Sequence, residues 1–207
     1  TDESTWNDIA RRCPAVVYVI GTTVENWLAY ITEFLQRLAT DVPLLAQIMP
    51  CQKAPLTLES IAVDSGDVHD GGRSVALLTF NDGQRCAYKP KDLRVVGRTL
   101  DLFAQINTHA GKDLLHVRSI LIRDGYAWEG FVNILPCATH SDLELYYHRF
   151  GAMARMYELL EARDLWLDNV IASGAWPVVI DLEMVMQPRM QTATPIDAAE
   201  QAARLVQ

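Results

Sequence analysis

The chain has 207 residues, of which 50% are apolar and 21% charged, and its formal net charge is −8 at pH 7. This composition suits a folded chain with one or two hydrophobic cores, and it argues against general nucleic-acid binding, which relies on a basic surface. The longest apolar run, at residues 13–21, is much shorter than the ~20 residues that cross a bilayer, and no secretory pattern is present. We therefore expect a cytoplasmic protein without a membrane span.

The first part of the chain, residues 1–60, is expected to be a helical scaffold. Thr22 and Glu25 have the three-residue spacing of a capping box, which marks the start of a helix. Apolar residues then recur at helical spacing as far as residue 39. Three prolines predict an irregular connection after this helix: Pro43, Pro50 and Pro55.

Strand patterns dominate the next part of the chain, from residue 61 onward. A hairpin is predicted at residues 74–89, because two apolar strands flank the turn sequence Asn-Asp-Gly at 81–83. A helix with one buried apolar face is expected at residues 99–109. Further strands are expected at residues 61–63, 117–122 and 128–135.

A second long helix is predicted towards the C-terminal end of the chain. Ser141 and Glu144 form another capping-box pattern, and the helix is expected to continue to residue 160. Its inward face is expected to contain Leu143, Tyr147, Phe150, Ala154 and Tyr157. A loop at residues 164–169 and two strands, at 170–172 and 178–181, are expected to follow.

The order of these elements, with strands first and helices later, predicts an α+β fold. We expect two lobes arranged as in a kinase, an antiparallel sheet lobe followed by a helical lobe, over residues 61–207.

Phosphoryl transfer from ATP requires groups that hold the triphosphate, place Mg²⁺ and orient the acceptor hydroxyl. A glycine-rich turn at residues 66–72, followed by Arg73, is typical of backbone that approaches phosphate oxygens, although a polar loop fits the same residues. Lys89 ends an apolar strand, as does the strand lysine of protein kinases, and a lysine at a sheet edge is the alternative. Glu129 lies on an aromatic strand where a kinase has its hinge, and simple packing of this strand is the alternative.

Two polar motifs follow the second long helix. Asp164 and Asn169 are five residues apart, which is the offset between the base and an Mg²⁺ ligand in kinase catalytic loops, although a turn also uses such residues. Asp181 and Glu183 follow a buried apolar strand, where carboxylates need a compensating charge such as Mg²⁺. The joint order of these motifs predicts a phosphotransferase that uses ATP and Mg²⁺.

These motifs resemble those of the dehydratase domain of type 2 lanthipeptide synthetases. The resemblance extends from about residue 35 to residue 189. It is carried by Gly66-Asp67-Val68-His69 with Gly72-Arg73-Ser74-Val75, by Ala87-Tyr88-Lys89-Pro90, by residues 126–132, 146–151 and 164–169, and by Ile180-Asp181-Leu182-Glu183. It implies a lipid-kinase-like fold that phosphorylates Ser and Thr of a ribosomally made precursor peptide with ATP and Mg²⁺. The same domain then eliminates the phosphate, which leaves dehydroalanine or dehydrobutyrine.

The resemblance also implies roles for individual residues. The catalytic residues would be Lys89, Asp164 as the base, and Asp67 and His69 beside the phosphates, where they would assist elimination. The nucleotide-binding residues would be Gly72, Arg73, Lys89 and Glu129. The metal site would contain Asn169, Asp181 and Glu183.

The sequence departs from the family pattern in three respects. Trp166 stands where the family's catalytic loop has His, and the resembling domain continues beyond the motif at residues 181–183, so we expect a core truncated at its C-terminal end. The expected helix at 99–109 offers Asp101 as its single acid, so Lys89 has no clear acidic partner there. Two alternatives therefore stay open: a degenerate pseudokinase module that binds nucleotide or peptide, and a small-molecule phosphotransferase.

Overall fold

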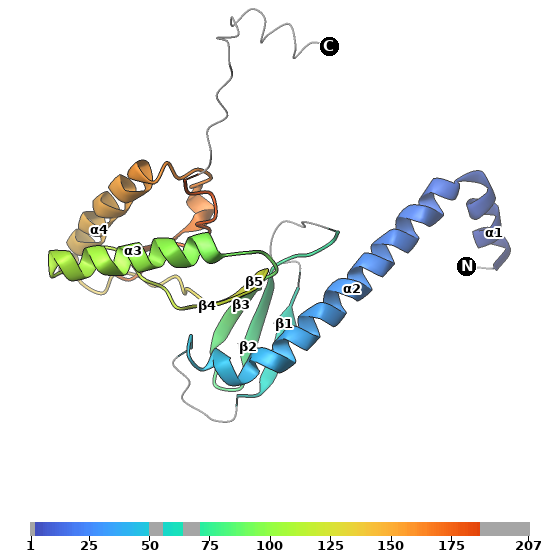
Figure 1. Ribbon diagram of the computed structural model, residues 1–207, viewed down its shortest axis with the longest axis horizontal. Coiled ribbons are helices and arrows are strands. Elements are labelled where there is room, and N and C mark those ends of the chain that lie inside the picture. Colours follow the sequence, from blue (N-terminus) through green and yellow to red (C-terminus); the bar gives the residue numbers. More distant parts are fainter. Residues whose placement is uncertain (1–2, 50–55, 64–70, 187–207) are drawn as a thin grey trace, which may run out of the picture.

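The computed structural model describes residues 3–49, 56–63 and 71–186, which form an antiparallel sheet, a separate two-stranded ribbon and the helices around them (Figure 1). The helices are α1 (Glu3–Arg12), α2 (Pro14–Leu45), α3 (Arg94–Ala110) and α4 (His140–Leu159), with a short 3-10 helix η1 (Leu167–Asn169). The strands are β1 (Leu58–Ala62), β2 (Ala76–Phe80), β3 (Arg85–Lys89), β4 (Ile120–Arg123), β5 (Tyr126–Gly130), β6 (Val170–Ser173) and β7 (Trp176–Val179).

The main sheet has the strand order β1-β2-β3-β5-β4, and each neighbouring pair is antiparallel. The predicted hairpin is confirmed: β2 and β3 are joined by a turn in which Gly83 has a φ of +79°. Strands β6 and β7 pair as a separate antiparallel ribbon. This combination of helices with an antiparallel sheet confirms the α+β class. The predicted domain boundary at residue 60 falls inside β1.

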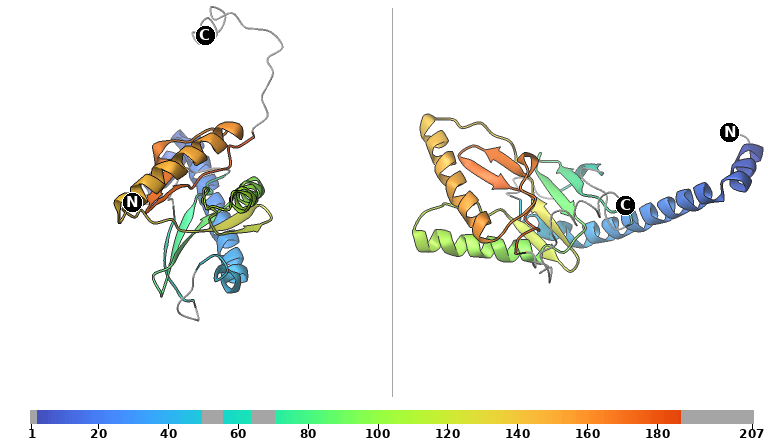
Figure 2. Two further views of the ribbon diagram at one scale, coloured as in Figure 1. Left: turned by 90° about the vertical axis from the view of Figure 1, so that its left-hand side faces the viewer. Right: turned by 90° about the horizontal axis from the view of Figure 1, so that it is seen from above.

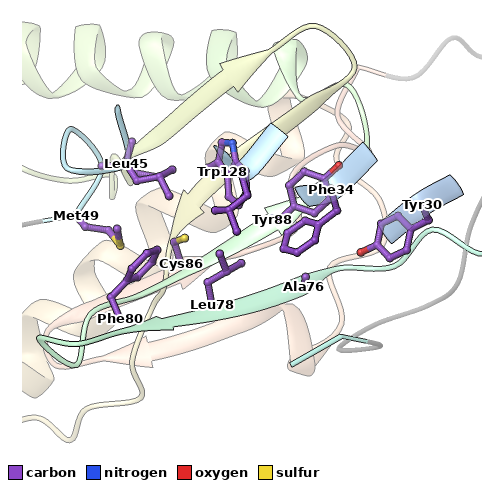
Figure 3. Packing of buried hydrophobic residues seen from close by; sticks show 12 residues of the cluster. Tyr30, Phe34, Leu45, Met49, Ala76, Leu78, Phe80, Cys86, Tyr88 and Trp128 are labelled. Atoms are coloured by element: carbon purple, nitrogen blue, oxygen red, sulfur yellow. The ribbon is translucent and has the colours of Figure 1, made fainter. Parts of the chain in front are cut away.

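Successive side chains along each strand point to opposite faces of the sheet, and the two faces have different surroundings. Ala76, Leu78 and Phe80 of β2 are fully buried on one face, as is Tyr88 of β3. They pack against the second half of α2 in a core that also includes Tyr30, Phe34, Leu45, Met49, Cys86 and Trp128 (Figure 3). The residues between them, such as Leu77 and Ala87, point to the opposite face, which is where the cleft described below lies.

A buried carboxylate ties α2 to the hairpin of β4 and β5. Asp41 of α2 is completely buried, and its Oδ1 accepts hydrogen bonds from Arg123 at 2.8 and 3.0 Å. Its Oδ2 accepts from the Tyr126 hydroxyl at 2.8 Å and from the Trp128 indole N–H at 2.9 Å. Burial by itself would raise the pKa of Asp41, but these hydrogen bonds outweigh it and hold the pKa below its usual range.

Helix α2 is longer than predicted at both ends. It begins at Pro14, because proline is tolerated at a first helical position, where its missing N–H costs nothing. Thr23, next to the predicted cap, instead donates its hydroxyl to the carbonyl of Val19 inside the helix. Pro43 lies in the last turn and does not break the helix earlier. The apolar first half projects away from the sheet and is largely exposed (Figure 2).

Helix α4 begins at a different cap and buries a different face from those predicted. The capping box is formed by Thr139 and Asp142, whose backbone and side-chain groups bond each other at 2.9 and 3.1 Å. Of the five residues expected to face inward, Tyr157 is buried, whereas Leu143, Tyr147, Phe150 and Ala154 are exposed. Apolar residues are spread around this helix, so its sequence does not single out one face. The buried face contains Arg149, Met153 and Tyr157.

A second hydrophobic core lies between helices α3 and α4 and strands β5 and β7. It includes Val96, Leu100 and Phe103 of α3, Met153 and Tyr157 of α4, Ala127 of β5 and Val179 of β7. Helix α3 begins five residues before its predicted start, and β5 ends at Gly130, before the predicted residue 135. Residues after β5 continue to the ribbon, where Leu135 bridges Ser173 in parallel. Within the described residues, no helix combines the length and apolar character needed to cross a membrane.

Candidate active site

A cleft of about 1200 Å³ lies between the second face of the sheet and the β6–β7 ribbon with its adjoining loops. Lys89 lines it from the sheet, while Asp164, Asn169 and Asp181 line it from the ribbon side. The sequence motifs predicted these four residues as parts of one phosphotransferase site, and all four line this cleft. Leu77 and Ala87 of the sheet and Ile171 of the ribbon add apolar walls.

The ammonium of Lys89 is held by three oxygens at the inner end of the cleft. Its Nζ lies 3.1 Å from Oε2 of Glu129, 2.7 Å from the carbonyl oxygen of Ile180 and 3.6 Å from Oδ1 of Asp181. The acidic partner that the sequence did not offer on the expected helix therefore lies on the neighbouring strand, β5. Lys89 is a diagonal neighbour of Glu129, because Ala87 is the residue directly opposite that glutamate.

Arg118 completes this buried group, although sequence reasoning assigned it no role. Its Nη2 lies 2.9 Å from Oε1 of Glu129, so the carboxylate stands between two cations. Arg118 also donates to the carbonyl oxygens of Val179 and Ile180, at the end of β7. It thereby connects the main sheet with the segment that leads to Asp181. The signal in the sequence was an arginine inside an apolar stretch that was expected to form a strand.

We expect the conservative change Arg118→Lys to lower the free energy of unfolding by about 1–3 kcal/mol. Lysine keeps the charge but lacks the planar fork that reaches Glu129 and two carbonyls together, so buried acceptors would lose their donors. Chemical denaturation of the purified chain measures this. Arg98→Lys is the matched control, because Arg98 is exposed and its change should cost less than about 0.5 kcal/mol. Equal effects of both changes would contradict a bridging role for Arg118.

Asp181 and Glu183 form a coupled acidic pair at the same end of the cleft. They follow β7 rather than lying on it, yet both side chains line the cleft, while Leu182 between them is buried in the second core. Burial alone would raise the pKa of Asp181, but the hydrogen bond from Glu183 and the charges of Lys89 and Lys91 lower it. Burial and the same hydrogen bond raise the pKa of Glu183. The pKa values of the two carboxyl groups are thus shifted in opposite directions, that of Asp181 downward and that of Glu183 upward.

Lys91 is a second cation at this end that sequence reasoning did not single out. Its Nζ pairs with Oε1 of Glu183 and lies 3.8 Å from Oδ1 of Asp181. That Oδ1 is buried and, within the described residues, accepts no hydrogen bond. Two ammonium groups face this oxygen at 3.6 and 3.8 Å, and a carboxylate oxygen of this kind is also a suitable ligand for a hard cation.

Asp164, Trp166 and Asn169 are held by contacts within their own loop. Asp164 has a φ of +63°, a left-handed conformation that is uncommon outside glycine and is often found at functional sites. Its Oδ1 accepts a hydrogen bond from the indole N–H of Trp166 at 2.5 Å. Its backbone carbonyl accepts from the side-chain amide of Asn169 at 2.9 Å. The loop thus fixes the direction of the Asp164 carboxylate without a histidine.

The other predicted residues lie at the edge of the cleft or outside the described residues. Arg73 lines the cleft, but its guanidinium pairs with Glu33 of α2, with Nη2 at 2.9 Å from Oε2. Gly72 has a φ of +92° and lies next to Asn26 of α2. Asp67 and His69 are outside the described residues.

The acidic groups of the cleft suit a metal that is bound together with phosphates. In the described part of the chain, no three His, Cys, Asp or Glu side chains are grouped closely enough to hold a metal ion. Mg²⁺ does not need such a group, since it keeps several waters and is usually bound by one or two carboxylates together with substrate phosphates. Asp181, with Asn169 beside it on the same side of the cleft, fits that type of site.

Comparison with known proteins shows the family to which the chain belongs. Residues 14–207 match the family described as a domain of unknown function, DUF4135, and the chain belongs to this family. It is also similar to the lacticin 481/lactococcin biosynthesis protein LcnDR2 of Lactococcus lactis subsp. lactis, with 22% identity over 193 residues. These residues make up 89% of this chain and 20% of the relative, so the chain spans about a fifth of that protein's length. The resemblance predicted from the motifs is supported in part by this similarity to a lacticin 481/lactococcin biosynthesis protein.

Proposed function

We propose that the chain contributes a kinase-like catalytic site to lanthipeptide maturation. The site transfers the γ-phosphoryl group of ATP to Ser or Thr of a ribosomally made precursor peptide, and the phosphate is then eliminated. The observation that carries this proposal is the single cleft in which Lys89, Asp164, Asn169 and Asp181 meet. The similarity to a lacticin 481/lactococcin biosynthesis protein supports the precursor peptide as substrate.

The lining of the cleft matches the two chemical parts of ATP. Lys89 and Lys91 lie at its inner end, where they would neutralise phosphate charge. Leu77 and Ala87 on the sheet, and Ile171 on the ribbon, provide apolar walls of the type that hold a flat base. Glu129 and Arg118 act behind Lys89 by fixing the position of its ammonium.

The residues that would hold Mg²⁺ are Asp181 and Asn169, with Glu183 supporting Asp181 through their shared hydrogen bond. When bound, the metal supplies charge that stabilises the phosphates during transfer. When no metal is bound, the ammonium groups of Lys89 and Lys91 balance the negative charge of the Asp181 carboxylate. The buried Oδ1 of Asp181 is the ligand atom that fits this role best.

Asp164 acts as the base for the Ser or Thr hydroxyl that accepts the phosphoryl group. It receives the proton that the Ser or Thr hydroxyl loses as its oxygen bonds to the γ-phosphorus, and the electrons of the broken P–O bond leave on ADP. Trp166 holds Oδ1 of this carboxylate, which leaves Oδ2 to accept the hydroxyl. Elimination then removes the Cα proton and the phosphate on Cβ, which forms the double bond. Asp67 and His69 are the residues proposed for that step.

The proposal is tested by incubating the chain with Mg·ATP and the precursor peptide of lacticin 481, the product after which the relative is named. We expect a thermal shift with Mg·ATP, and mass spectra in which the peptide gains phosphate or loses water. Absence of both effects would contradict the proposal. Nucleotide binding without any change in peptide mass would instead favour a degenerate nucleotide-binding module.

A further inference from the structure

We propose that Trp166 determines substrate specificity, by binding an apolar side chain two residues from the acceptor Ser or Thr. This inference rests on the proposed function and adds a preference among peptides. Trp166 has two separate parts: an N–H group that holds Asp164, and an aromatic surface that is open to the cleft.

The hydrogen bond between the indole and Asp164 fixes the distance between the ring and the reacting hydroxyl. Nε1 of Trp166 lies 2.5 Å from Oδ1 of Asp164, so one carboxylate oxygen is occupied and the other is free for the acceptor. An acceptor hydroxyl within hydrogen-bonding reach of that oxygen is necessarily close to the indole. The proton acceptor and the aromatic surface therefore act as one unit.

The aromatic surface is unusually exposed for such a large side chain. Trp166 is 70% exposed, and Ile134, which lines the same cleft from the segment after β5, is 78% exposed. Leu167, the next residue along the chain, is 92% exposed. Large apolar side chains that are left exposed beside a reaction site indicate a surface that is covered when a partner binds.

The geometry of an extended peptide identifies what covers this surface. In an extended chain successive side chains point to opposite faces, so the side chain two residues from an acceptor held at Asp164 shares its face and lies ~7 Å away, over or next to the indole. An apolar or aromatic side chain at that position would remove the ring from water and would gain its own burial energy. A polar side chain of similar size would lose hydration without gaining a partner, because the ring N–H is already bonded to Asp164.

Two variants test the N–H donor and the aromatic ring of Trp166 independently. Trp166→Phe keeps an aromatic surface and removes the N–H donor, whereas Trp166→Gln keeps an N–H donor and removes the ring. The probes are two fluorescein-labelled peptides with a single Thr, identical except that the residue two positions before it is Leu in one and Asn in the other. Their dissociation constants are measured by fluorescence anisotropy with Mg²⁺ and a non-hydrolysable ATP analogue present.

We expect the unmodified chain to bind the Leu peptide about tenfold more tightly than the Asn peptide, the equivalent of burying one or two methylene groups. Trp166→Phe should keep this ratio, while its kcat for both peptides falls about tenfold because Asp164 loses its hydrogen bond. Trp166→Gln should reduce the binding ratio to about twofold or less. Thermal unfolding confirms that both variants are folded.

Each other outcome has a distinct meaning. An unmodified chain without preference, or a preference that survives in Trp166→Gln, would overturn the inference. A weaker affinity for Mg·ATP in Trp166→Gln, with the peptide ratio unchanged, would assign the ring to the nucleotide and would also overturn it. The binding ratio is independent of turnover, so failure of phosphoryl transfer, which would contradict the proposed function, remains distinguishable from failure of this inference.

Discussion

Replacement of Asp41 by alanine is expected to lower the free energy of unfolding by about 3–5 kcal/mol, the usual cost of removing one partner from a buried charged pair. The Asp41 carboxylate is completely buried and accepts hydrogen bonds from three side chains: Arg123, Tyr126 and Trp128. Without it, the indole N–H of Trp128 is left in the core without its acceptor. The loss should appear as a lower denaturation midpoint with an unchanged slope.

Asp101→Ala is the matched control, because it removes an exposed aspartate whose pairing with Arg98 is long, at 3.5 Å. It should change the free energy of unfolding by less than about 0.5 kcal/mol. A similar small effect for Asp41→Ala would show that the hydrogen bonds of Asp41 are not a major support of the contact between α2 and the sheet.

The Asp41 carboxylate also makes the free energy of unfolding depend on pH. Its pKa in the folded state lies below the ordinary value of 3.8, because the hydrogen bonds from Trp128, Tyr126 and Arg123 outweigh the effect of burial. A lowered pKa contributes stability that is present above the unfolded pKa and is lost as the pH falls through the folded value. The unmodified chain should therefore lose this contribution below about pH 4, whereas Asp41→Ala should lack that component of the pH dependence.

Features that depend on neighbouring residues were predictable from the sequence. The hairpin of β2 and β3 follows from alternating apolar residues around Asn-Asp-Gly, and the α+β class follows from the order of strands and helices. That Lys89 and Asp181 each follow an apolar, buried segment is also visible in the sequence, whereas their meeting in one cleft comes from the fold. Such signals are local, so a single sequence contains them.

Features that depend on contacts between distant residues were not predictable. Glu129 and Arg118 are 40 and 29 residues from Lys89, and their ion pairs exist because β5 lies between β3 and β4 in the sheet. The sequence suggested a helix as the place for an acidic partner, whereas the fold provides it from the next strand. The face that α4 buries was likewise unpredictable, because it depends on contacts with distant elements, among them that of Arg149 with Trp176 of β7. The ring of Trp176 is 3.3 Å from that guanidinium.

Replacement of Asp181 by asparagine is expected to weaken Mg·ATP binding by at least about 100-fold, because a charge-assisted contact to the metal is lost. Asparagine keeps the size of the side chain and one oxygen, but it carries no charge. Lys89 and Lys91 lie 3.6 and 3.8 Å from the Asp181 carboxylate, so the change also removes the anion that holds these cations at the inner end of the cleft. Isothermal titration calorimetry with ATP, with and without Mg²⁺, measures both effects.

The dependence on Mg²⁺ is the decisive measurement. In the unmodified chain, Mg²⁺ should strengthen ATP binding strongly, whereas in Asp181→Asn the two titrations should become nearly equal. Asp124→Asn is the matched control, since this exposed aspartate in the turn between β4 and β5 undergoes the same change in charge and should keep the full effect of Mg²⁺. If Asp181→Asn retained that effect while remaining folded, the carboxylate would serve only as a counter-ion for Lys89 and Lys91, and the metal would have to be held elsewhere.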